Sequence, residues 1–324
     1  MTVSDTVPRL DDVLAAREAI RGRLHRTPVL GSATLSELAG ARVLLKAELF
    51  QKTGSFKPRG VLANLAALGP EERALGVIST SAGNHAQAVA WGAAAEGLSS
   101  LLVMWQGVSE LKVEATRGYG AEVDLEARSG AEAFERLTQL QEQSGRIFIH
   151  PFDHPLTVAG QGTIGLEVLE DVPEADVVVV PVGGAGLVAG ITVSVKSLRP
   201  KTRVIGVEPE LAPSLHEALA VGRPVQVEPR SVADGLGAPF VGELSLAVCR
   251  ERLDGLVLLS EAEIEQGMRF LYTRAKLACE PAGAAAVAAL LAGKIPLDAG
   301  ETAVAVVSGG NVASETAVAI LAGR

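Results

Sequence analysis

Short runs of apolar residues alternate along this chain with longer stretches in which apolar residues recur every three or four positions. The short runs predict buried strands, and the longer stretches predict helices. In the first half, strands are expected at 43–47, 76–79, 101–104, 122–125 and 146–149, and helices at 11–23, 61–68, 84–95, 110–117 and 131–143. In the second half, strands are expected at 177–180, 203–207, 255–259 and 303–308. Helices are expected at 160–170, 261–276 and 281–291, and another follows the strand 177–180 and ends at 198.

This alternation is typical of an α/β protein whose largely parallel sheets are covered by helices on both faces. Ligands then bind at the carboxyl ends of the strands. The chain has 324 residues, and neither a repeat nor a Pro/Ser-rich linker divides it. We therefore expect two α/β lobes that share an interface, which is the usual place for a binding site.

Composition and charge exclude several kinds of partner. The net charge is −9 and only 3% of the residues are aromatic, whereas nucleic-acid binding usually needs a basic surface and stacking rings. Residues 177–195 carry no charge, but Pro181 and the cluster Gly183, Gly184 and Gly186 in their middle favour a strand, a loop and a helix over a membrane span. The N-terminus lacks the pattern of a signal peptide. We expect a cytoplasmic protein in which Cys249 and Cys279 are reduced.

Two loops in the first half carry candidate chemistry. Lys57 lies between Phe56 and Pro58, just before a predicted helix. A helix N-terminus there disfavours a charged ammonium and lowers the lysine pKa, as a Schiff-base former needs; a solvated loop lysine is the alternative. In the loop 79–85, three hydroxyls, a glycine and free helix amides can bind a carboxylate or phosphate. The alternative is that Ser81 simply caps the helix.

A third loop, residues 181–187, is rich in glycine and lies between a predicted strand and a predicted helix. Glycines let a backbone approach an anion closely, and the helix directs its positive end at that anion. The loop also fits a dinucleotide-binding fingerprint through Gly184, Gly186 and Ala189, with Glu208 as the ribose-binding acid. Both interpretations stay open at this point.

The fourth loop, residues 306–311, places the neutral hydroxyl of Ser308 at the edge of a sheet. Together the four loops resemble those of fold-type II pyridoxal-phosphate enzymes of the serine/threonine dehydratase group, and most closely those of the short catabolic threonine dehydratases. The resemblance runs from about His25 to about Val312. It includes LKAE at 45–48, SFK at 55–57, SAGNHAQ at 81–87, AGQGT at 159–163, ADG at 233–235, EPAG at 280–283 and SGGN at 308–311.

The resemblance implies a role for each loop. Lys57 would hold pyridoxal 5′-phosphate as a Schiff base and then remove the α-proton of the substrate. Asn84 would bind the ring oxygen of the cofactor, and Ser308 would face its pyridine nitrogen. Ser81, with the amides of Asn84 and His85, would bind the substrate carboxylate. The other implied cofactor contacts are Phe56, Gly183, Gly184, Ala185, Gly186, Leu187 and Glu280.

The resemblance also implies a two-domain architecture similar to the tryptophan synthase β subunit. Residues 1–74 and 150–324 would form a large cofactor domain, and residues 75–149 a small, mobile domain that closes over the substrate. The implied reaction is the dehydration of L-threonine or L-serine to a 2-keto acid and ammonia by a homodimer or homotetramer. A serine racemase or 3-hydroxyaspartate dehydratase of the same group is an alternative, and an NAD-dependent oxidoreductase is a more remote one.

Three positions depart from the pattern of the family. Ala82 stands where the racemases carry a serine that acts on the opposite face of the substrate, and this favours dehydration. Ala185 replaces a glycine in the phosphate loop, and we expect it to keep a negative φ. The residues Glu208, Ala212 and Ser214 match a divalent-cation site with one carboxylate missing, so at most a weak site is expected.

Overall fold

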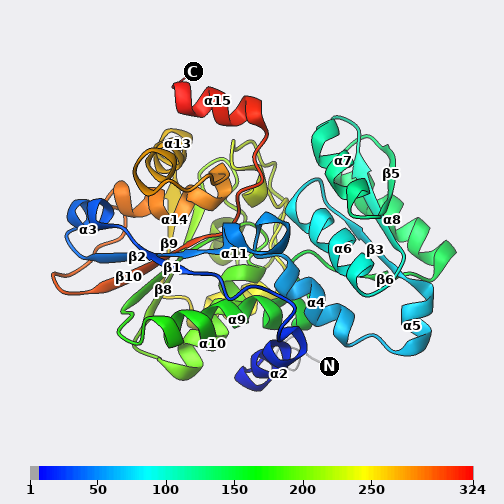
Figure 1. Cartoon of the computed structure of the whole chain (residues 1–324), viewed down its shortest axis with the longest axis horizontal. Coiled ribbons are helices and arrows are strands. Elements are labelled where there is room, and N and C mark those ends of the chain that lie inside the picture. Colours follow the sequence, from blue (N-terminus) through cyan, green and yellow to red (C-terminus); the bar gives the residue numbers. More distant parts are fainter. Residues whose placement is uncertain (1–6, 324) are drawn as a thin grey trace.

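The computed structural model describes residues 7–323, which contain two β-sheets that lie side by side (Figure 1). In this described part, the larger sheet has six strands in the order β1–β2–β10–β7–β8–β9. Only β1 is antiparallel to its neighbour. The strands are β1 (Val29–Gly31), β2 (Arg42–Ala47), β7 (Val177–Pro181), β8 (Arg203–Pro209), β9 (Gly255–Leu259) and β10 (Thr302–Val307).

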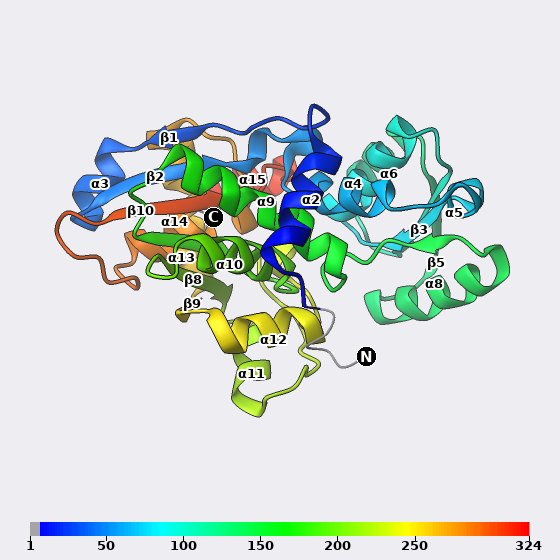
Figure 2. The same cartoon turned by 90° about the horizontal axis from the view of Figure 1, so that it is seen from below.

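Helices cover both faces of the larger sheet because its central strands are apolar on both sides. They are α2 (Leu10–Ile20), α3 (Ala33–Ala39), α9 (Pro155–Asp171), α10 (Gly186–Leu198), α12 (Glu243–Arg252), α13 (Glu261–Phe270) and α14 (Pro281–Leu291). From β7, Val178 and Val180 join the core with α2, α9, α10 and α12. Val177 and Val179 join the opposite core with α3, α13 and α14. Figure 2 shows α2, α9 and α10 across the first face.

The smaller sheet is parallel throughout, in the order β5–β4–β3–β6. Its strands are β3 (Val77–Thr80), β4 (Ser100–Trp105), β5 (Glu122–Ala127) and β6 (Ile147–Phe148), and its helices are α6 (Asn84–Ala95), α7 (Glu110–Gly118) and α8 (Gly130–Ser144). The helix α4 (Pro58–Ala66) lies between the lobes. Its residues Val61, Leu62 and Leu65 pack with α6 in one apolar cluster, and its Gly60 lies against Gly160 of α9. The helix that follows Lys57 is therefore held by both lobes.

The predicted α/β class and the largely parallel sheets are confirmed. Some boundaries were wrong: α9 begins at Pro155 rather than 160, and the predicted helix 261–276 ends as an α-helix at Phe270 and continues as a π-helix, Leu271–Ala275. The pattern also missed β1 and several helices: α3, α5 (Pro70–Leu75), α11 (Ser214–Val221), α12 and α15 (Ser314–Ala322). No helix among residues 7–323 is long and apolar enough to span a membrane.

A buried cluster of charges joins α4 to β2 and α9. Arg59 donates to both carboxylate oxygens of Glu48, at 2.8 Å each, and to both of Glu167, at 2.7 and 2.9 Å. Lys46 donates to Glu167 at 2.6 Å and to the carbonyl oxygen of Thr27 at 2.8 Å. Arg59, Glu48 and Lys46 are almost completely inaccessible to solvent. Such a cluster fixes geometry, because each charge depends on its partners in a medium that solvates ions poorly.

We expect Glu48→Ala to lower the free energy of unfolding by about 3–5 kcal/mol, because it leaves the buried Arg59 with one carboxylate instead of two. Denaturant unfolding measures the loss. Glu174→Ala is the matched control, since its partner Arg42 and Glu174 itself are both about half exposed, and a surface pair contributes less than about 1 kcal/mol. Equal losses in the two variants would contradict this view of the buried cluster.

Candidate active site

Lys57 lies at the N-terminus of α4, between the two sheets. Its Nζ donates to the carbonyl oxygen of Pro151 at 2.9 Å and lies 5.1 Å from the centre of the Phe56 ring. No ion pair among residues 7–323 includes Lys57. The amine thus lies in a protein environment with a carbonyl and an aromatic ring nearby, but without a bonded carboxylate.

Burial lowers the pKa of the Lys57 amine to about 8, and the negative charge of Glu280 opposes that shift. The direction agrees with the sequence-based expectation, but desolvation rather than the helix N-terminus is the main cause. Part of the side chain stays open to solvent, so the effect is smaller than for a completely enclosed amine. An amine with such a pKa is partly neutral, and hence nucleophilic, near neutral pH.

Asn84 and the loop after β10 meet at the side of Lys57. Asn84, the first residue of α6, donates from Nδ2 to Glu280 Oε1 at 2.7 Å. Asn311 donates from Nδ2 to Asn84 Oδ1 at 2.8 Å. The backbone N–H of Phe56 donates to the carbonyl oxygen of Ser308 at 3.1 Å. Three of the loops singled out by sequence are therefore joined directly, although they are far apart in the chain.

Glu280 is the buried acid of this group. Burial raises the pKa of its carboxyl to about 8, and the nearby Asp234 raises it further, while Asn84, Lys112 and Lys57 lower it. Oε1 lies so close to Gly309 that a Cβ at that glycine would come within 2.2 Å of it. The sequence motif therefore requires glycine at 309 because the carboxyl of Glu280 occupies that space.

The glycine loop after β7 lies on the other side of Pro151. A Cβ at Gly184 would come within 2.3 Å of the Phe152 ring, and one at Gly186 within 2.5 Å of the Phe152 carbonyl oxygen. Phe152 follows the residue that Lys57 contacts, so this loop also belongs to the site. The first turn of α10 contains no acidic residue, and its free N–H groups can bind an anion. Gly183 leads into this turn, and Leu187 is buried in the helix.

The expectation for Ala185 was wrong. Its φ is +66°, in the left-handed region, and it is the N-cap of α10. A residue with a Cβ is disfavoured in that region by about 1–2 kcal/mol. The turn adopts this conformation because the chain must reverse tightly between β7 and α10 while Gly184 and Gly186 lie against Phe152.

Ser81 and His85 lie at the start of α6, as predicted. Ser81 Oγ accepts from the backbone N–H of Gly83 at 3.1 Å, and Gly83 rather than Ser81 is the N-cap. His85 Nε2 contacts Ser79 Oγ and the Ile149 carbonyl oxygen, both at 3.0 Å. Burial, followed by the charge of Lys57, lowers the pKa of His85 to about 3. Its ring is therefore neutral and holds the loop in place, while its backbone N–H remains near the helix start.

Glu208, Ala212 and Ser214 lie together, but the carboxylate of Glu208 is already engaged. It accepts from the backbone N–H groups of Leu215 at 2.7 Å and His216 at 2.9 Å, and from Ser214 Oγ at 3.3 Å. Burial raises the pKa of Glu208 to about 7. Ser214 Oγ also lies 3.1 Å from the Gly183 carbonyl oxygen. Both oxygens of Glu208 thus bind the start of α11, and Ser214 links this acid to the glycine loop.

Sequence reasoning missed contacts that cross between the lobes. Lys112 of α7 forms an ion pair with Asp234 of the 3₁₀-helix Asp234–Leu236. Phe134 of α8 lies 6.0 Å from Phe240, whose ring is in turn 5.5 Å from Phe152. In the sequence, Lys112 and Phe134 have the pattern of ordinary helix-surface residues. Of these contacts, only Asp234 belongs to a motif that the sequence analysis singled out, ADG at 233–235.

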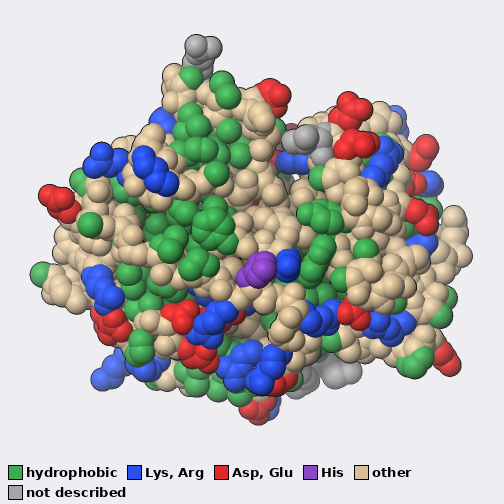
Figure 3. All heavy atoms as spheres, viewed as in Figure 1, with side chains coloured by type: hydrophobic (Ala, Val, Ile, Leu, Met, Phe, Trp, Pro, Cys, Tyr) green, Lys and Arg blue, Asp and Glu red, His purple; other side chains and the backbone are tan. Residues whose placement is uncertain are grey.

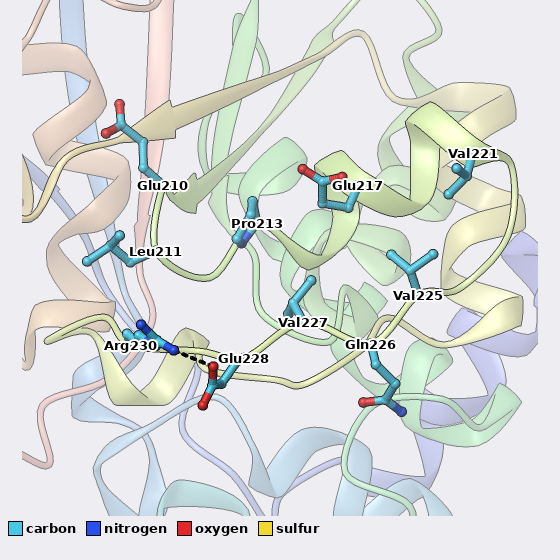
Figure 4. Close-up of a pocket in the computed structure, with 10 residues that line it drawn as sticks. All are labelled: Glu210, Leu211, Pro213, Glu217, Val221, Val225, Gln226, Val227, Glu228 and Arg230. Atoms are coloured by element: carbon cyan, nitrogen blue, oxygen red, sulfur yellow. Dashed lines mark hydrogen bonds and ion pairs between the residues drawn. The ribbon is translucent and has the colours of Figure 1, made fainter.

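A pocket of about 540 Å³ lies apart from these residues, beside α11 (Figure 4). Acidic and apolar side chains line it, and Arg230 is paired with Glu228 across its wall. None of the predicted site residues belongs to this pocket. The candidate site is therefore defined by the convergence of the four loops and not by this pocket.

Comparisons with known proteins agree with this arrangement. Residues 20–309 match the family described as "Pyridoxal-phosphate dependent enzyme". The chain is 43% identical to L-threonine ammonia-lyase of Thermotoga maritima, over 94% of this chain and 75% of that protein. It is 42% identical to phenylserine dehydratase of Ralstonia pickettii, over 89% and 88%. Its fold is similar to that of maize serine racemase, with a TM-score of 0.92, 33% identity and coverage of 96% and 95%.

We expect Lys57→Met to stabilise the apoprotein by about 2 kcal/mol at pH 7, because it removes a desolvated ammonium. The gain should shrink as the pH rises from 8 toward 10.5, the pKa of an ordinary lysine. In that range the native amine loses its proton before the unfolded one does, so the parent protein recovers stability. Denaturant unfolding at pH 7 and pH 10 checks this, and a methionine variant less stable than the parent at pH 7 would contradict it.

Proposed function

This chain belongs to the family of pyridoxal-phosphate dependent enzymes, and on that premise we propose that it dehydrates L-threonine, and also L-serine, to a 2-keto acid and ammonia. The observation that carries the proposal is the amine of Lys57, which has no bonded carboxylate among residues 7–323. It bonds to Pro151, and the next residue, Phe152, packs against the glycine loop. The similarity to an L-threonine ammonia-lyase over 94% of the chain supports the choice of substrate.

The residues present fit pyridoxal 5′-phosphate group by group. A partly neutral lysine amine fits its aldehyde, and the free N–H groups at the start of α10, among residues 183–187, fit its phosphate. Gly184 and Gly186 let this loop lie against Phe152, where a Cβ would clash. The carboxamide of Asn84 suits the ring oxygen. Ser308 offers a neutral hydroxyl to the pyridine nitrogen, and Phe56 and Glu280 complete the surroundings.

When bound, the cofactor supplies an electron sink for the pair of electrons left behind by the α-proton. Lys57 Nζ takes that proton, because a pKa near 8 leaves part of the amine neutral at physiological pH. Ser308 cannot protonate the pyridine nitrogen as a carboxylic acid could, which keeps the sink weak. A weak sink suits a reaction in which the β-hydroxyl leaves almost as soon as the proton is removed.

The start of α6 holds the substrate carboxylate. The backbone N–H groups of Asn84 and His85 and the hydroxyl of Ser81 lie at this helix N-terminus, where an anion is favoured. The neutral His85 ring, fixed by Ser79 and Ile149, adds no competing charge. Because these groups belong to the smaller sheet and Lys57 to the other lobe, the domain 75–149 would close on the substrate through Lys112–Asp234.

We further propose that the enzyme is a cytoplasmic homodimer or homotetramer with no nucleic-acid or membrane partner. The net charge of −9 supports the absence of nucleic acid. Exposed apolar side chains support self-association, and Figure 3 shows hydrophobic side chains gathered on the larger lobe. The exposed large apolar residues of the chain include Leu38, Phe50, Val318 and Leu321. Divalent cations would bind only loosely at Glu208, Ala212 and Ser214, because both oxygens of Glu208 accept hydrogen bonds from α11.

Keto-acid formation from a panel of β-hydroxy amino acids tests the proposed reaction. We expect turnover of L-threonine and L-serine by the yellow holoenzyme, and a fall of about 10³-fold or more in Lys57→Ala together with loss of the yellow absorbance. Lys52→Ala, in the same loop, is the control and should keep both. A Lys57→Ala protein that remains yellow after dialysis and still forms keto acid would disprove the role of Lys57.

Ala82 separates dehydration from racemisation. We expect the parent to form little D-serine, because Lys57 alone moves the α-proton and acts from one face. Ala82→Ser should raise D-serine formation slightly relative to keto acid, whereas Ala82→Gly, which adds no hydroxyl, should not. Chiral chromatography of serine after incubation measures this. Substantial D-serine from the parent would favour the racemase alternative suggested by the fold similarity to maize serine racemase.

A further inference from the structure

A chain of hydrogen bonds with one direction runs across the candidate site. Asn311 Nδ2 donates to the carbonyl oxygen of Thr53 at 2.6 Å and to Asn84 Oδ1 at 2.8 Å. Asn84 Nδ2 in turn donates to Glu280 Oε1 at 2.7 Å. The chain connects the Lys57 loop, the start of α6 and the loop after β10. Nothing in the proposed mechanism yet uses Asn311.

The donors and acceptors of these bonds determine whether the oxygen or the nitrogen of the Asn84 carboxamide faces Glu280. The Thr53 carbonyl oxygen can only accept, so it keeps the nitrogen of Asn311 directed toward Thr53 and Asn84. The amide nitrogen of Asn311 donates, so it favours the oxygen of Asn84. This contact leaves the nitrogen of Asn84 toward Glu280 Oε1, and a flipped Asn84 would bring two amide nitrogens together.

Close packing also holds the Asn311 side chain in place. Gly54, with φ of +73°, lies so near that a Cβ there would come within 2.5 Å of Asn311 Oδ1. Gly309 packs against Asn84 in the same way, because a Cβ at Gly309 would lie 3.2 Å from Asn84 Nδ2. The two glycines let the backbone approach these carboxamides closely. The amide of Asn311 is thus held between Thr53, Gly54 and Asn84.

We propose that Asn311 is a positioning residue that turns the N–H of Asn84 toward the ring oxygen of the cofactor. This inference rests on the proposed function, since it assumes that pyridoxal 5′-phosphate binds beside Asn84. An amide nitrogen has two hydrogens, and Glu280 uses one of those on Asn84. The other remains to stabilise the deprotonated, charged ring oxygen, because a hydrogen bond to a charged form favours that form. That oxygen state gives the yellow form of the holoenzyme rather than a near-ultraviolet one.

Asn311→Asp and Asn311→Ala test the proposal. The first is isosteric but cannot donate, and the second removes the amide without adding a charge in case the aspartate variant fails to fold. We expect the absorbance of both holoenzymes to move from the yellow band toward the near-ultraviolet band between pH 6 and 9. The apparent dissociation constant for pyridoxal 5′-phosphate should rise about tenfold, as for one lost hydrogen bond to a charged group.

Asn64→Asp is the matched control for a purely structural effect. Asn64 is another buried carboxamide, and its Nδ2 also makes two bonds, to the Gly60 carbonyl oxygen at 2.7 Å and to Thr157 Oγ1 at 2.9 Å. Its loss should lower thermal stability by a similar amount to Asn311→Asp. The spectrum and the cofactor affinity of Asn64→Asp should remain those of the parent.

Parent-like spectra and cofactor affinity in both Asn311 variants would overturn the inference, as would an equal spectral change in Asn64→Asp. Failure of the proposed function is recognised separately. A parent protein that gives no yellow form with pyridoxal 5′-phosphate disproves both proposals. A yellow parent that forms no keto acid disproves the proposed reaction, while the spectra of the variants still decide the role of Asn311.

Discussion

The structure depends on keeping the amine of Lys57 in a protein environment where no carboxylate of the described residues bonds to it. Burial opposes its charge, and a free side chain would move to water to avoid that penalty. The surroundings prevent this: Pro151 accepts from Nζ, and the Phe56 ring lies beside it. The backbone of Phe56 is bound in turn to Ser308. Reactivity therefore arises from a position that the rest of the fold must hold against a local free-energy cost.

Helix α4 does most to keep Lys57 in this position. It places Lys57 at its first turn, and two residues later Arg59 is bound by Glu48 and Glu167 from other elements. Gly60 packs directly on Gly160, where a Cβ would come within 2.6 Å of the α4 backbone. Charge pairing fixes the helix about its axis, and glycine contact fixes its distance from α9. Neither contact touches the reacting atoms, yet both determine where Nζ lies.

The sequence revealed the parts of the site whose chemistry is local. A strand followed by glycines and a helix predicts an anion site, and the loops 79–85 and 181–187 were found in this way. Lys57 was found from its position just before a helix, and Ser308 from its position at the end of a strand. Contacts between distant segments were not visible: Lys112 and Phe134 have ordinary neighbours in the sequence, and the SGGN motif did not indicate that Asn311 contacts Asn84. The backbone conformation of Ala185 could not be predicted from the sequence for a different reason. The positive φ follows from packing of the adjacent glycines against Phe152, a residue over 30 positions away.

The distribution of contacts between the lobes has a mechanical consequence. On one side, α4 and α6 share an apolar cluster in which Gly92 lies close to Val61 and Leu65. On the side of the site, the lobes meet through a few separate contacts: Asn84 with Glu280, Lys112 with Asp234, and Phe134 with Phe240. Apolar packing resists separation more than a partly exposed ion pair does. Any opening of the lobes would therefore pivot on α4 and α6, and it would separate Asn84 from its partners while leaving Lys57 in place.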